Sequence, residues 1–202
     1  MKILLASNNK HKQKEMQQIF DAEAPGKIEL IIPDDIFDKR YNVEENADTL
    51  EGNAFLKAQA FFELAEMPVI ADDTGLEIDA LKGAPGVHSA RYAGEHGDDE
   101  ANRRKVLSLI TGVPEERRGA QFRTVICFIE TGEPIYVDGK CKGKIIEEER
   151  GSAGFGYDPI FIPEGYDKTF AEMPAEEKNK ISHRANAALN LIKLLKAMKE
   201  EF

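Results

Sequence analysis

The sequence has no long apolar run, few cysteines and no excess of positive charge. No apolar stretch approaches the roughly 20 residues that span a bilayer, and the apolar segment after Met1 is too short for a signal peptide. We therefore expect a cytoplasmic protein with no membrane partner. The chain contains two cysteines, Cys127 and Cys141, which we expect to be reduced thiols in that compartment rather than a disulfide.

The formal net charge of −10 at pH 7 limits the partners further. A broad nucleic-acid surface needs a basic face, so we expect no nucleic-acid partner. A small anionic ligand is compatible with this charge. It needs only a local group of lysines, arginines and backbone N–H groups, with or without a metal ion.

The chain also lacks internal repeats, low-complexity tracts and Gly/Ser-rich linkers, which argues against independent domains. Its 202 residues, 42% of them apolar, suit one large domain or two closely fused lobes. The expected elements run βα, then β-rich, then α, which predicts an α/β fold with a mixed sheet flanked by helices. We expect a single domain over residues 1–202, with an α/β lobe at about 1–115 and 160–202 and a β-rich lobe at about 116–159.

Local patterns predict where these elements lie. Apolar residues at helical spacing predict helices over 10–20 and 98–110 and in the segment from Pro174, with Leu109 on the inner face of the second. A capping signal at Asp48 and Glu51 predicts another helix ending near Ala65. Residues 81–97 are expected to form a long loop. The predicted strands are 2–6, 28–32, 68–71, 121–130, 135–138 and 159–162, with 143–149 as a separate strand or a continuation of the one before it.

Residues 6–12, Ala-Ser-Asn-Asn-Lys-His-Lys, lie between the first strand and the first helix. Backbone N–H groups at a helix start attract anions, and Lys10 and Lys12 add positive charge. The segment is not a Walker loop, because G-x-x-x-x-G-K-S/T is absent. The alternative is a capped surface helix with solvated lysines, since Ser and Asn also cap helices.

An acidic set follows the strand predicted in the middle of the chain. Asp72 and Asp73 are adjacent and repel each other unless positive charge is near, and Glu77, Glu44 and Glu45 add further carboxylates. Mg²⁺ typically takes one or two carboxylates plus substrate phosphates. An aspartate at the carboxyl end of a strand therefore predicts a Mg²⁺ site. The alternative is turn chemistry for the aspartates and solvent exposure for the glutamates.

Two later segments carry further candidates. In residues 151–161, glycines surround Phe155, which lets a backbone approach a flat ligand while the ring stacks on it. Alternatively, Phe155 fills the core. Three basic residues cluster at the start of the last helix, where they oppose the helix dipole unless an acceptor-rich ligand compensates or the face is solvated; these are Lys178, His183 and Arg184. Together the four segments suit a nucleoside triphosphate.

The chain as a whole resembles the inosine/xanthosine triphosphate pyrophosphatases, through six motifs in order. These motifs are S-N-N-x-x-K, E-E-N-A-x-T-x-x-x-N-A-x-x-K-A, A-D-D-T-G-L, G-A-P-G-V-x-S-A-R-Y, G-F-G-Y-D-P-x-F and K-x-x-I-S-H-R. The resemblance implies an elongated, two-lobed α/β protein, usually a homodimer, with the active-site cleft between its lobes. It also implies Mg²⁺-dependent hydrolysis of ITP, dITP and XTP to the monophosphate and pyrophosphate, which removes them from the nucleotide pool.

The resemblance implies roles for single residues as well. Asp73 matches the general base and a metal ligand, and Glu44 matches the second metal ligand, or Glu45 if the register shifts by one. Arg184 matches a base contact. Because a guanidinium can only donate, it suits the 6-oxygen of hypoxanthine and xanthine and not the 6-amino group of adenine. The matched substrate-binding residues are Ser7, Asn8, Asn9, Lys10, His11, Lys12, Lys57, Thr74, Phe155, Gly156, Tyr157, Asp158, Lys178, His183 and Arg184. Asn8 stands where many relatives have Gly, and Thr74 where many have Ser.

Two other functions compete with this one. Maf-type nucleotide pyrophosphatases are similar in fold and favour other nucleotides, but G-F-G-Y-D and S-H-R argue against them. A nucleotide-binding regulatory protein without turnover would have less need of Asp73 and Glu44. Pyrophosphate release from a panel of nucleotides distinguishes the three.

Overall fold

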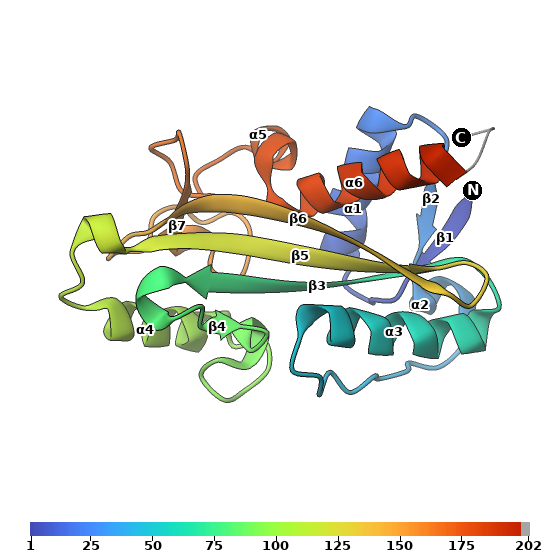
Figure 1. Cartoon of the computed structure of the whole chain (residues 1–202), viewed down its shortest axis with the longest axis horizontal. Helices are drawn as coiled ribbons and strands as arrows, with labels where there is room; N and C mark the ends of the chain where they lie inside the picture. Colours follow the sequence, from blue (N-terminus) through green and yellow to red (C-terminus); the bar gives the residue numbers. More distant parts are fainter. Residues whose placement is uncertain (199–202) are drawn as a thin grey trace. The chain divides into compact units, whose positions relative to one another are not determined.

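The computed structural model describes residues 1–198, and its strands form a mixed sheet (Figure 1). The strand order is β2-β1-β3-β5-β6-β7, with β4 paired to β3. β1 is parallel to β2 and β3, whereas β4 is antiparallel to β3 and β7 to β6. The strands are β1 (Lys2–Leu5), β2 (Glu29–Ile31), β3 (Val69–Ile78), β4 (Pro85–Gly86), β5 (Gly119–Ile129), β6 (Pro134–Ile145) and β7 (Phe161–Pro163).

Helices flank this sheet, which confirms the predicted fold class. They are α1 (Lys10–Glu23), α2 (Pro33–Ile36), α3 (Leu50–Ala65), α4 (Asp99–Ile110), α5 (Ala175–Ile181) and α6 (His183–Met198). Among residues 1–198, no helix has the length and apolar character needed to cross a membrane.

The chain forms two compact units. Unit 1 consists of Met1–Asp73, Thr124–Gly139 and the segment from Arg184, and unit 2 of Thr74–Arg123 and Lys140–His183. These divisions differ from the predicted lobe boundaries near residues 115 and 160. The long strands β5 and β6 explain the difference, because each contributes residues to both units and no segment of the chain is purely a β-rich lobe. The single-domain organisation stays a prediction.

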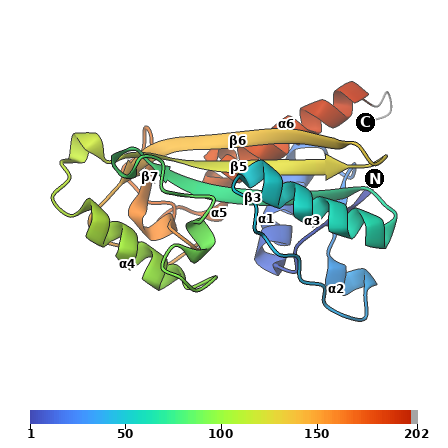
Figure 2. The same cartoon turned by 60° about the horizontal axis from the view of Figure 1, so that its bottom comes forward.

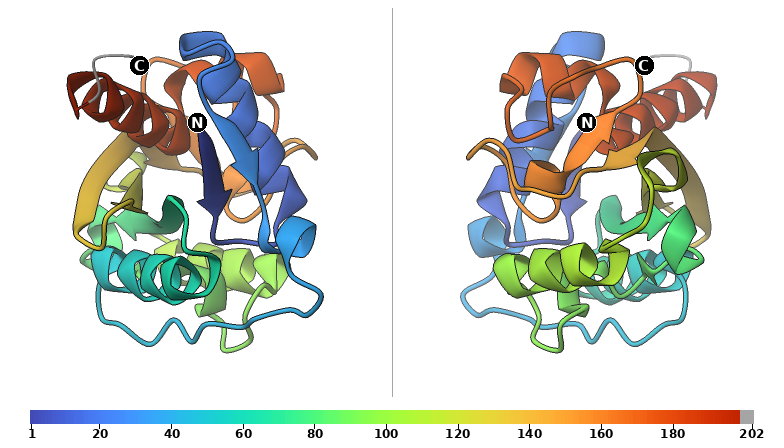
Figure 3. Two further views of the ribbon diagram at one scale, coloured as in Figure 1. Left: turned by 90° about the vertical axis from the view of Figure 1, so that its right-hand side faces the viewer. Right: turned by 90° about the vertical axis from the view of Figure 1, so that its left-hand side faces the viewer.

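Within unit 1, helices lie on both faces of the strands (Figure 3), and alternate residues of the strands belong to different hydrophobic clusters. Ile3 and Leu5 share a hydrophobic cluster with α1 and α6, whereas Leu4 and Ala6 share another with α3. The same alternation separates Ile70 of β3 from its neighbours. Because these strands are buried on both faces, they appear in the sequence as continuous apolar runs.

Within unit 2, α4 packs on the strands β3 and β5 (Figures 1 and 2). Val106 and Ile110, one turn apart, are fully buried in this cluster. The prediction that Leu109 also faces inward is wrong, since its side chain is 47% exposed. Leu109 lies one step around the helix from the apolar stripe.

The strand predicted at residues 68–71 is longer than expected. β3 continues through Asp72 and Asp73 to Ile78, so the two aspartates lie in the middle of a strand and not at its end. Leu76 pairs with Gly86 of β4, and a Cβ on Gly75 would lie 2.7 Å from the Gly86 carbonyl oxygen. Glycine at 75 therefore permits close strand pairing and does not mark a turn. The loop expected over 81–97 contains β4 and a short 3-10 helix, Ser89–Arg91.

Two further boundaries differ slightly from the sequence prediction. Thr49, not Asp48, caps α3, and its Oγ1 accepts the N–H of Gly52 at 3.0 Å. The helix ends at Ala65, as predicted. β6 runs without interruption to Ile145, so residues 143–145 continue this strand and do not begin another.

Candidate active site

In unit 1, Asp72 lies at the centre of a buried group of charges. Lys12 Nζ is 3.0 Å from Asp72 Oδ1, and Arg184 Nε is 3.6 Å from Oδ2. Burial alone would raise the pKa of the Asp72 carboxyl, but the charges of Lys12 and Arg184 hold it well below its ordinary value. Asp72 is therefore an ionised anchor for two cations, a role that the sequence did not predict.

Arg184 is the largest fully buried side chain in the described part of the protein. Besides Asp72 it contacts Glu15, whose Oε2 accepts a hydrogen bond from Arg184 Nη1 at 2.6 Å. Sequence reasoning missed Glu15. Its place on α1, three residues after Lys12, indicates only an ordinary helix-surface pair, and its partner is 169 positions away in the chain.

The loop before α1 is organised by its own side chains. Asn9 Oδ1 accepts the backbone N–H groups of His11 and Lys12 at 3.0 and 3.1 Å, and Ser7 Oγ accepts that of Asn9 at 3.2 Å. The structure thus supports the capping alternative for these N–H groups. Asn8 Oδ1 accepts the backbone N–H of Asp34 at 3.2 Å. The side chains of Lys10 and His11 are exposed.

Asp73 lies beside side chains of α3. Asn53 Nδ2 donates to Asp73 Oδ2 at 3.1 Å, and Lys57 Nζ donates to Glu45 Oε2 at 3.0 Å and to the Asp72 carbonyl at 2.9 Å. Asn53 and Lys57 are four residues apart and share a helix face. Burial raises the pKa of Asp73 above its ordinary value; Lys57 opposes this shift and the negative charge of Glu45 adds to it.

The structure favours Glu45 over Glu44 as the partner of Asp73. Residues 41–46 belong to no helix or strand, and Tyr41, Val43 and Glu45 are half-buried whereas Glu44 is exposed. A two-residue period of this kind is typical of a segment whose alternate side chains lie on opposite sides. The sequence assignment preferred Glu44. The alternation of Tyr41 and Val43 with polar residues was the signal for the other register.

The carboxylates around Asp73 suit a metal ion that is completed by its substrate. Within residues 1–198, no three metal-ligating side chains gather at one point. Asp73 and Glu45 are two carboxylates close enough that the charge of Glu45 adds to the rise that burial causes in the pKa of Asp73. Mg²⁺ fits such a pair, because it takes one or two carboxylates and fills its other positions with water and phosphate oxygens.

In unit 2, Phe155 is presented outward. Its side chain is 43% exposed, and Lys178 Nζ lies 5.2 Å from the ring centroid. Asp158 Oδ2 accepts both the backbone N–H of Phe155 at 3.0 Å and Lys178 Nζ at 2.7 Å. The alternative in which Phe155 fills the core is therefore wrong, because its side chain reaches the surface.

Other predicted residues of unit 2 stabilise the fold around this ring. The Tyr157 hydroxyl donates to the Ser89 carbonyl at 2.7 Å, and burial raises the pKa of this phenol. His183 is buried and stacks on Phe122 with ring centroids 4.6 Å apart. Thr74 is half-buried in β3.

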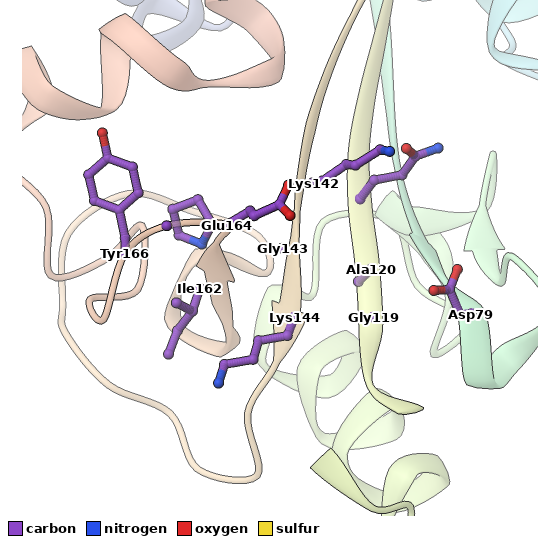
Figure 4. A pocket seen from close by; sticks show the side chains of 12 residues that line it. Asp79, Gly119, Ala120, Lys142, Gly143, Lys144, Ile162, Glu164 and Tyr166 are labelled. Atoms are coloured by element: carbon purple, nitrogen blue, oxygen red, sulfur yellow. The ribbon is translucent and has the colours of Figure 1, made fainter. Parts of the chain in front are cut away.

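A pocket of about 570 Å³ lies elsewhere in unit 2 (Figure 4). Its lining includes Lys142, Lys144, Glu164 and Tyr166, and none of the predicted site residues contributes to it. Lys144 is already paired with Glu115. The residues predicted to act on a nucleotide therefore do not line this pocket.

Comparison with known proteins identifies relatives over nearly the whole chain. The model of the Ham1 family matches residues 3–194. A dITP/XTP pyrophosphatase of Porphyromonas gingivalis is 50% identical over 190 residues, covering 94% of this chain and 95% of that protein, and one of Bacillus subtilis is 46% identical, covering 96% of each. The structure of the Staphylococcus aureus Ham1 protein is similar with a TM-score of 0.85 at 40% identity, over 98% of this chain and all of that one.

Proposed function

This chain belongs to the Ham1 family, and we propose that it hydrolyses dITP, XTP and ITP to the nucleoside monophosphate and pyrophosphate. Family membership confirms the resemblance inferred from the motifs. One observation carries the proposal. Asp73, Lys57 and Glu45 form a charged group in unit 1 of a chain 50% identical to a dITP/XTP pyrophosphatase. The reaction clears these nucleotides from the nucleotide pool.

In this reaction water attacks the α-phosphorus, and the bond to the bridging α–β oxygen breaks as pyrophosphate leaves. Negative charge develops on the bridging oxygen, so positioned cations provide most of the catalysis. Lys57 and Lys12 supply two such cations. Lys57 is held by Glu45 and the Asp72 carbonyl, and Lys12 by the Asp72 carboxylate.

Asp73 accepts the proton of the attacking water. A carboxylate of raised pKa is a better base near neutral pH, and burial raises the pKa of Asp73 in this way. Asn53 Nδ2 donates to Oδ2 of Asp73 and so orients that carboxylate. Asp73 and Glu45 would hold Mg²⁺, which would neutralise phosphate charge when bound.

The purine base stacks on Phe155, beside Lys178. Arg184 donates to the purine 6-oxygen, with its guanidinium held by Glu15. The resemblance also assigns substrate contacts to the remaining matched residues, besides the contacts that fix Asn9, Tyr157 and His183 within the fold. These residues are Ser7, Asn8, Asn9, Lys10, His11, Thr74, Gly156, Tyr157, Asp158 and His183.

The test is pyrophosphate release from ITP, XTP, dITP, dTTP, UTP and ATP, each with and without Mg²⁺. We expect turnover of the first three with Mg²⁺, at least about 10²-fold faster than of ATP. Asp73→Asn should lower turnover by about 10²–10³ or more while the protein stays folded. Preference for dTTP or UTP would indicate a Maf-type enzyme, and ITP binding without pyrophosphate release would indicate a regulatory protein.

We also propose a homodimer in the cytoplasm, as the resemblance implies. The proposed substrates are soluble nucleotides of the pool that feeds nucleic-acid synthesis, which fits that location. Light scattering of the purified protein gives the mass in solution. A monomer mass at micromolar concentration would contradict the dimer.

A further inference from the structure

Two side chains on one turn of α4 contact the backbone of the loop that carries Phe155. Asp99 Oδ2 accepts the N–H of Gly156 at 2.8 Å, and Arg103 Nη1 donates to the carbonyl of the same glycine at 2.8 Å. Asp99 and Arg103 are four residues apart and so share a helix face. Arg103 is itself fixed, because its Nε donates to Glu149 at 2.8 Å and its side chain is only 14% exposed.

These contacts hold the backbone on both sides of Phe155, from which its ring projects. The peptide before Phe155 is held by Asp158, which accepts the Phe155 N–H, and the peptide after it is held by Asp99, which accepts the Gly156 N–H. Each peptide is planar, so holding both leaves the Phe155 backbone little freedom. Gly156 has a φ of +60°, a conformation that other residues rarely adopt, and the loop contains no regular element over residues 151–157 that could fix the ring instead.

We propose that Asp99 and Arg103 are positioning residues for the purine base, holding the Phe155 ring ready for stacking. The inference rests on the proposed function of this site, and neither residue belongs to any of the six motifs. A ring that is fixed before binding loses less conformational freedom when the base arrives, so the effect falls on binding. Asp99 and Arg103 touch no reacting atom, and the chemical step should not change.

The experiment compares steady-state kinetics with ITP for Asp99→Ala, Asp99→Asn, Phe155→Ala and the double variant Asp99→Ala/Phe155→Ala. Loss of one base–aromatic stack corresponds to roughly a 5- to 150-fold loss of affinity, so we expect KM to rise by about 5- to 20-fold in Asp99→Ala and more in Phe155→Ala, with kcat within about threefold. Asp99→Asn keeps an acceptor oxygen and should recover most of the affinity. The double variant should have the KM of Phe155→Ala, because Asp99 acts through that ring.

Glu100→Ala is the matched control. It also removes a carboxylate from the first turn of α4, but Glu100 is exposed and pairs with Arg104 at 3.8 Å, so KM should not change. Two results would overturn the inference, even if the melting temperature fell. One is a KM for Asp99→Ala equal to that of the wild type. The other is a rise of KM in the double variant that equals the product of the rises in the two single variants.

Failure of the proposed function can be distinguished from failure of the positioning role. If the wild-type protein releases no pyrophosphate, the function is wrong, and the same variants are compared by calorimetric titration with ITP. A 5- to 20-fold weaker Kd for Asp99→Ala, restored by Asp99→Asn, would then support the positioning role. Equal Kd values, or no ITP binding by the wild type, would reject it.

Discussion

Lys12 Nζ and Asp72 Oδ1 lie 3.0 Å apart, and the Asp72 side chain is 1% exposed. With Arg184 and Glu15 they form a group of two cations and two carboxylates inside unit 1. The charges of such a group compensate one another only while every member is present. An ion left without its partner in the interior has lost its hydration and gains no attraction in return. This arrangement explains why two aspartates can be adjacent in β3. Asp72 belongs to the buried ion group, and Asp73 contacts α3, the helix that carries Asn53 and Lys57.

The first prediction concerns the stability of this ion group. Asp72→Asn leaves Lys12 and Arg184 with one carboxylate between them, and we expect the free energy of unfolding to fall by about 3–5 kcal/mol. Urea unfolding followed by circular dichroism measures it. Glu29→Gln is the control, because its pair with Lys2 is 3.6 Å long and both side chains are more than 60% exposed, so its loss should change little. Equal unfolding midpoints for the two variants would contradict the buried role of Asp72.

The second prediction separates Glu45 from Glu44. Glu45→Gln removes the carboxylate that holds Lys57 and stands beside Asp73, and we expect a loss of about 10²–10³ in kcat together with a higher Mg²⁺ requirement. Glu44→Gln changes an exposed side chain and should leave kcat within about twofold. Magnesium titrations of both variants give the comparison. A larger loss of kcat in Glu44→Gln than in Glu45→Gln would instead assign the metal-ligand role to Glu44.

Only part of the site depends on local sequence patterns. Strand alternation and helix spacing placed most elements, and the motifs named Asp73, Lys57 and Phe155. The role of Asp72 was not predictable, because it depends on Arg184, 112 positions further along the chain. The role of Asp99 was not predictable either, because its hydrogen bond with Gly156 joins residues 57 positions apart. A local pattern cannot report such pairs, whose distances are set only when the whole chain has folded.

The length of β3 also differs from the prediction, for a different reason. Asp, Asp, Thr and Gly in succession favour a turn by local preference. Pairing with β5, and with β4 at Leu76 and Glu77, overrides that preference. The absence of a Cβ at Gly75 allows the β3 and β4 backbones to approach. Tertiary pairing thus changed a predicted strand end into the middle of a ten-residue strand.

The third prediction concerns the two thiols. Burial raises the pKa of Cys127 from 9.0 to about 12 and that of Cys141 to about 11. At pH 8 the thiolate fraction of Cys127 is then roughly 10³-fold below that of a free cysteine, so reaction with a disulfide reagent should be slower by about that factor. Both thiols should react at once in guanidinium chloride. Fast labelling of Cys127 in the native protein would contradict its burial.

The same shifts predict how stability depends on pH at the alkaline end. The folded protein keeps its thiol protons at higher pH than the unfolded chain, so the contribution is fully present below about pH 9 and is lost as the pH rises toward 12. Cys127→Ala should show a shallower loss of unfolding free energy between pH 9 and 11 than the wild type. Parallel pH profiles of the two proteins would show that the Cys127 thiol does not contribute.

The last prediction tests whether Arg184 reads the base. Arg184→Lys keeps a positive charge near Asp72 and Glu15 but loses the planar set of donors, which is not a conservative change at such a site. If Arg184 donates to the purine 6-oxygen, the ratio of kcat/KM for ITP to that for ATP should fall by about tenfold or more. Glu15→Gln, which weakens the contact that holds the guanidinium, should lower the ratio in the same direction by a smaller factor. A folded Arg184→Lys variant with an unchanged ratio would remove Arg184 from base recognition and leave it with the single role of balancing Asp72 and Glu15 in the interior.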